Sequence, residues 1–137
     1  MRSIRKKPSI GICQWGDKNL GINTDTMIWL MQNPVLDKTI EFADNRIFLF
    51  AAQYGRCAVT GADLMPYDIR CHHKVPLENG GTDDYDNLVL VTEAVHLLIH
   101  ATLDTTIQKH LSDLQLDKKQ LGKLNKLREL AGVPVIA

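Results

Sequence analysis

The stretch of sequence that decides the fold runs from residue 71 to residue 100 and reads CHHKVPLENGGTDDYDNLVLVTEAVHLLIH. It contains four of the five histidines of the chain. His96 and His100 stand four positions apart, so on a helix they share one face and can chelate one divalent ion. By itself this spacing is common among surface histidines, and it gains weight only from the pair His72 and His73 upstream.

The histidine pair and the loop after it predict how a metal ion would be held. Adjacent side chains on a strand point to opposite faces, so one of His72 and His73 can reach a metal while the other faces a substrate. Asn87 precedes a short apolar run and can hydrogen-bond across the loop to hold it closed. The Gly80–Gly81 pair gives the loop backbone freedom. We therefore expect two strands and a helix with a metal between them.

Hydrophobic periodicity extends this unit in both directions. We expect a helix over residues 37–54 that stops at Gly55, and a β-hairpin formed by residues 57–60 and 68–72. Residues 88–91 are expected to form a strand, after which Thr92 caps a helix that ends near His100. Two further helices are expected, over residues 105–113 and 118–131. The predicted fold class is α+β.

The chain is expected to consist of an N-terminal extension, residues 1–35, followed by one domain, residues 36–137. Scattered glycine, asparagine and proline in the extension are typical of loops and short elements. Within it, the run MIWLM at residues 27–31 is an apolar anchor, either a helical turn or a strand. The length of 137 residues, 45% of them hydrophobic, suits a single domain with a modest core.

Composition also bears on location and redox state. The sequence lacks the run of about 18 apolar residues that a membrane-spanning helix needs. The basic first residues are not followed by an apolar stretch, so a secretory signal is not expected and the cytoplasm is the expected compartment. Cys13, Cys57 and Cys71 make an odd count without a framework pattern, which disfavours a disulfide scaffold.

Charge is distributed unevenly although the net charge is zero. Residues 1–56 have a net charge of +3, residues 57–100 of −5 and residues 101–137 of +2. An acidic centre between basic arms suits a cation site beside a polyanion, and it equally suits a solvated surface. The same two interpretations apply to the lysine-rich face of residues 118–131, which is either solvated or in contact with nucleic-acid phosphate.

The quoted residues resemble the HNH endonucleases, whose core is the ββα-metal fold, over about residues 57–101. The resemblance implies that His72, His96 and His100 hold a divalent metal ion, that His73 is the general base, and that Asn87, the middle residue of the motif, belongs with His73 to the catalytic residues. It points to magnesium, whereas imidazole ligands also suit manganese, nickel or zinc. A neutral imidazole takes a proton from water near neutral pH, which fits phosphodiester hydrolysis.

A wider stretch, about residues 35–133, resembles the C-terminal endonuclease region of bacterial group II intron reverse transcriptase/maturases. The residues that carry this likeness are Asn45-Arg46-Ile47, the run from Ala52 to Gly61, and the lysine- and leucine-rich end of the chain. It implies DNA as the substrate, with intron RNA reached through a larger parent protein. The chain has no reverse-transcriptase motif, so it is either a piece of such a protein or a free-standing relative.

Two departures from the HNH pattern limit the site. Thr60 stands where a second thiol after Cys57 would be needed, and no cysteine follows Cys71, so we expect no structural zinc site. Cys57 and Cys71 are expected to face each other across the hairpin, either as small buried hydrophobes or as a partial metal site. Arg70 stands where some HNH enzymes place an acid, so a fourth protein ligand is not expected.

Several charged residues near the motif have two interpretations each. Arg56, Arg70 and Lys74, with Arg46, are candidates for contacting phosphate and steadying the transition state, or they are solvated charges. The loop residues Asp83, Asp84 and Asp86 are interpreted as turn formers rather than as a carboxylate metal cluster, and His110 is given no role.

Two alternatives to a nuclease stay open. One is a nucleic-acid-binding module that keeps the HNH fold with little activity alone. The other is a structural zinc domain of three histidines and Cys71, which is disfavoured because Cys71 and His72 point to opposite faces.

Overall fold

The computed structural model describes residues 2–3, 5–6, 23–35 and 38–136. The first two of these ranges form a short parallel pair, β1 (Arg2–Ser3) and β2 (Arg5–Lys6). The remaining elements, in chain order, are α1 (Thr24–Gln32), α2 (Ile40–Ala52), β3 (Ile69–His73), the 3-10 turns η2 (Leu77–Asn79) and η3 (Tyr85–Asn87), β4 (Leu88–Thr92), α3 (Glu93–His100), α4 (Asp104–Leu114) and α5 (Lys118–Leu130). The expected α+β class is confirmed.

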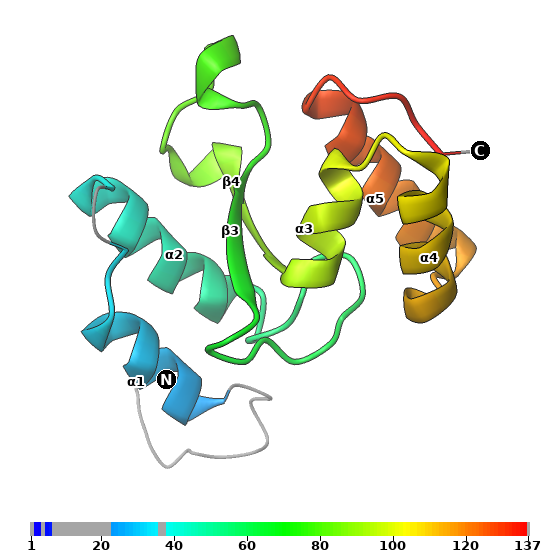
Figure 1. Cartoon of the computed structure of the whole chain (residues 1–137). Helices are drawn as coiled ribbons and strands as arrows, with labels where there is room; N and C mark the ends of the chain where they lie inside the picture. Colours follow the sequence, from blue (N-terminus) through cyan, green and yellow to red (C-terminus); the bar gives the residue numbers. More distant parts are fainter. Residues whose placement is uncertain (1, 4, 7–22, 36–37, 137) are drawn as a thin grey trace.

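The elements are arranged around the hairpin of β3 and β4 (Figure 1). α2 lies on one side of the hairpin and α3 on the other, while α4 and α5 pack against the far side of α3. The apolar anchor at residues 27–31 is part of α1, which packs beside α2. The rest of the N-terminal extension lies largely outside the described residues. Among the described helices, none is long and apolar enough to cross a membrane.

The predicted hairpin between residues 57–60 and 68–72 is wrong. β3 instead pairs with β4 in antiparallel register, from Ile69 opposite Thr92 to His73 opposite Leu88. Residues 57–60 turn back on themselves, because Gly61 N–H donates to the Cys57 carbonyl and Cys57 N–H donates to the Ala62 carbonyl. All five residues of β4 are buried, so this apolar strand needs packing on both of its faces. It therefore lies between α2 and α3 and pairs with β3.

The outer edge of β4 is covered by one side chain and one backbone group. Gln53 accepts from Leu90 N–H at 3.0 Å and donates to the Leu90 carbonyl at 2.9 Å. Ala58 N–H also donates to that carbonyl. Cys71 lies opposite Leu90 in the register, so the expectation that it faces Cys57 across a hairpin is wrong as well.

Helix ends follow the capping residues closely. Thr92 accepts from Val95 N–H and begins α3 directly after β4, as predicted. Thr39 caps α2, and Asp117 with Gln120 forms a capping box at the start of α5. α2 ends where Tyr54 and Gly55 take positive φ values of 56° and 69°, which stops a helix.

Arg128 is buried, although the sequence places it on a charged face. Its guanidinium donates to the carbonyls of Leu98, Ala101 and Pro134 at 2.6, 2.9 and 2.8 Å. Since the last carbonyls of a helix lack partners within it, the bonds to Leu98 and Ala101 hold the C-terminal end of α3. That end carries His100, so α5 acts as a support for the side chains on α3.

Candidate metal centre and active site

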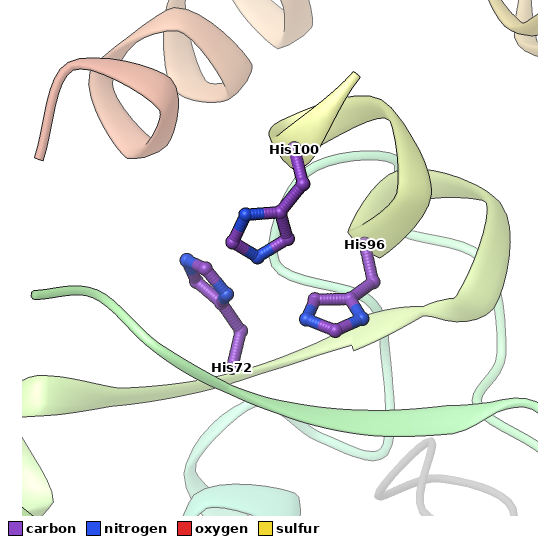
Figure 2. A group of neighbouring side chains, drawn as sticks. All are labelled: His72, His96 and His100. Carbon is purple, nitrogen blue, oxygen red and sulfur yellow. The ribbon is translucent and has the colours of Figure 1, made fainter. Parts of the chain in front are cut away.

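Three histidines from two elements converge on one point (Figure 2). His72 extends from β3, and His96 and His100 extend from successive turns of α3. One ring nitrogen of each lies within 4.8 Å of the others, and the ring centroids are 5.0 to 5.3 Å apart. The structure thus brings together the three side chains that the sequence singled out as ligands.

Burial makes these imidazoles suitable metal ligands. His72 is 2% exposed, and its Nε2 atom has no hydrogen-bond partner. Burial, followed by the neighbouring His96 and His100, lowers the pKa of His72 to about 3, and burial lowers the pKa of His96 as well. The rings of His72 and His96 therefore keep their lone pairs at neutral pH, which is the form that binds metal. A buried nitrogen without a partner is costly, and a divalent ion would satisfy it.

The cluster follows from local structure. In the register of the hairpin, His72 lies opposite Val89 and points toward α3, which starts immediately after β4. The spacing of four residues places His96 and His100 on the same face of α3. Three protein nitrogens leave coordination positions free for water and phosphate, as catalytic metal sites require. The residues present therefore fit a divalent ion.

His73 lies on the other face of β3, toward α2. Its ring stacks on Phe42, with centroids 5.6 Å apart and an interplanar angle of 24°. Its Nε2 atom lies 2.7 Å from Asp83 Oδ1. The alternation of side chains along a strand separates His72 and His73 as expected, and only His72 joins the cluster.

One cavity connects the two sides. It has a volume of about 300 Å³ and is lined by Lys38, Phe42, Cys71, His72, His73, Pro76, His96 and His100. All four histidines of the motif therefore reach the same space. A phosphodiester group entering it would meet the candidate metal ligands and His73 together.

Asn87 holds the loop between the strands. Its Oδ1 accepts from Val75 N–H at 2.9 Å, and its Nδ2 donates to the carbonyls of Val75 and Thr82 at 3.0 and 2.8 Å. Both hydrogens of its amide are used in these bonds, and the side chain does not line the cavity. The structure therefore gives Asn87 the loop-locking position that the sequence predicted, while its catalytic assignment stays a prediction.

None of the four cations proposed to contact phosphate lines the cavity. Arg56 lies 3.9 Å from Asp63 beyond the C-terminal end of α2, and Arg70 lies 3.3 Å from Glu93, near His96. The buried Arg46 donates to the carbonyls of Leu30 and Asn33 at the end of α1, so its guanidinium is occupied there. Neither these three nor Lys74 lines the cavity.

Lys38 is the cation that sequence reasoning missed. It lines the cavity, and its ammonium lies 5.6 Å from the centre of the Phe42 ring. Asp83 was also missed as a partner of His73, because its place in a glycine-rich acidic loop suggested only a turn. Lys38 is far in sequence from the histidines of the cavity, and Asp83 reaches His73 through an irregular loop, so no periodic pattern marks either residue.

Comparison with known proteins bears on the central part of the chain. Residues 55–101 match the family model described as HNH endonuclease. No curated protein and no solved structure matches the chain. The match covers about a third of the sequence and includes the three clustered histidines, His73 and Asn87. It supports a nuclease of the HNH type, a family whose domains typically bind a divalent metal.

Proposed function

We propose that this chain is a metal-dependent endonuclease that hydrolyses DNA phosphodiester bonds with the residues of the central cavity. The observation that carries the proposal is the meeting of three mutually close imidazoles with a fourth histidine across one cavity. The match of the same residues to the HNH endonuclease family supports it.

His72, His96 and His100 would hold the divalent ion. A bound ion would supply Lewis-acid stabilisation of charge on the phosphate and on the leaving oxygen. We propose magnesium on the ground of the family resemblance, while the imidazole set would also accept manganese, nickel or zinc.

His73 is proposed as the general base. Its Nδ1 atom is the ring nitrogen that Asp83 does not occupy, and the ring lines the cavity. His73 takes a proton from the water that attacks phosphorus, the bond from phosphorus to the 3′ oxygen breaks, and solvent protonates that oxygen. Lys38 places a positive charge at the same cavity, where it would bind the phosphate.

The group II intron context is a finer proposal that rests on sequence resemblance. Some residues of that resemblance hold the fold together: Asn45 bonds the Asp83 carbonyl, Arg46 bonds α1, and Gln53 bonds β4. On this proposal the chain is the DNA-nicking part of an intron-encoded protein, and other parts of a larger parent protein contact the intron RNA.

The test is nicking of supercoiled plasmid by the purified chain with magnesium, manganese or nickel. We expect nicking that EDTA abolishes and that His73→Ala reduces at least about 100-fold, the usual scale of a lost general base. His110→Ala is the matched control, because His110 lies on α4 outside the cluster. Salt-sensitive DNA binding with the plasmid left intact in all three metals would refute the enzyme and favour the binding module.

A further inference from the structure

Asp83 makes three hydrogen-bond contacts with groups on the His73 side of the cavity. Its Oδ1 lies 2.7 Å from His73 Nε2, and its Oδ2 accepts from Thr39 Oγ1 at 2.8 Å. Its backbone carbonyl accepts from Asn45 Nδ2 at 2.9 Å. Both carboxylate oxygens and the main chain are therefore held in place.

The chemistry of this contact defines where the hydrogen of the imidazole lies. The bonds from His73 and Thr39 lower the pKa of Asp83, so the carboxylate is ionised at neutral pH and can only accept. The hydrogen of a neutral His73 ring must then be on Nε2, which leaves the lone pair on Nδ1.

α2 supplies the other constraints on the ring. Thr39 Oγ1 accepts from Phe42 N–H at 2.9 Å as the cap of α2, so one hydroxyl joins the helix start to the carboxylate. Phe42, one turn further on, stacks on the His73 ring and sets its plane. Thr39, Phe42 and Asn45 all precede residue 55, so they lie outside the segment that matches the HNH family.

We infer that Asp83, held by Thr39, is the positioning residue that fixes His73 in the tautomer with a bare Nδ1 facing substrate. α2 is thus a part of the active site. This inference deepens the proposed function and rests on His73 as its base. A ring free to exchange tautomers would spend part of its time with a hydrogen on Nδ1. In that tautomer Nδ1 cannot accept a proton from water.

The competing explanation is that Asp83 only anchors the loop. Asn45→Ala is the matched control for it, because it removes the bond to the Asp83 carbonyl and leaves the carboxylate contacts. Asp83→Asn is the complementary variant. An amide can bond both His73 and Thr39 in either orientation, so the loop keeps its contacts while the choice of tautomer is lost.

The experiment uses imidazole ¹⁵N NMR of the metal-free protein at about pH 8, where an ordinary histidine is neutral, together with plasmid nicking in magnesium. For the unaltered protein we expect the His73 signature of a protonated Nε2. Asp83→Asn should give mixed tautomers, an unchanged melting temperature and nicking lowered at least about 10-fold, the scale seen for lost supporting bonds. Asn45→Ala should keep the signature and lose less nicking.

A His73 ring protonated on Nδ1 in the unaltered protein would overturn the inference. So would a single tautomer and full nicking in Asp83→Asn, or equal effects of the two variants in both assays. If the unaltered protein nicks no DNA but Asp83→Asn still mixes the tautomers, the positioning role stands and the nuclease proposal fails.

Discussion

Replacing Gly81 by alanine is predicted to displace the loop that Asn87 holds. A Cβ atom at position 81 would lie 1.8 Å from the Val75 carbonyl oxygen, 2.7 Å from its carbon and 2.9 Å from Asn87 Nδ2. Ordinary contacts of this kind begin at 3.4 Å. The first two atoms belong to backbone, so no side-chain rotation relieves the overlap and the two loop segments must separate by more than about 1 Å.

The cost follows from the bonds that this separation breaks. Asn87 makes two hydrogen bonds to Val75 and one to Thr82, and Gly81 N–H donates to the Pro76 carbonyl. With a net contribution of about 0.5–1.5 kcal/mol for each bond, losing two to four of them lowers the free energy of unfolding by about 1–6 kcal/mol. Asp83 lies two residues further along, so His73 would lose its support and nicking would fall as well.

Urea unfolding measures this effect, and Gly122→Ala is the matched control. Gly122 lies in α5 with no atom within 4 Å of a built Cβ, so alanine there should stabilise the helix by up to about 1 kcal/mol. A Gly81→Ala protein that unfolds at the same urea concentration as the unaltered chain would refute the account of the loop.

Three further predictions concern β4, the cavity and the buried histidine. Gln53→Ala removes bonds to Arg56 and to both backbone groups of Leu90, so urea unfolding should show a loss of about 1.5–4.5 kcal/mol, whereas the exposed Gln108→Ala should show none. Lys38→Gln should raise KM for DNA nicking and lower the slope of log binding constant against log salt by about one, with an unchanged melting temperature; an unaltered slope would remove Lys38 from the phosphate contact. The pKa of His72 is about 3 in the folded state against 6.5 ordinarily, so between these values the unfolded chain binds more protons. The stability of metal-free protein should therefore fall as pH drops from about 6.5 toward 3, by at most about 1.4 kcal/mol per pH unit from this group, and pH-independent unfolding in EDTA would contradict this.

Helices were predicted from the sequence with small errors at their ends. We expected helices over residues 37–54, 105–113 and 118–131. The corresponding helices of the structure span Ile40–Ala52, Asp104–Leu114 and Lys118–Leu130. Apolar spacing and capping residues act within a few positions of one another, so they are visible in the sequence itself. The pairing of strands was not predictable in the same way. Which strand partners β3 depends on burying β4 on both faces, and that is a property of the assembled core.

The sequence by itself predicted that His96 and His100 share one face of a helix, because they stand four positions apart, and that one of His72 and His73 joins them while the other faces away, because side chains alternate along a strand. The family resemblance assigned the ligand position to His72. Only the tertiary structure decided what surrounds His73. Lys38, Thr39, Phe42 and Asn45 reach the cavity or its acidic loop because α2 packs against the hairpin, and packing between segments about 40 residues apart leaves no periodic signal in the sequence.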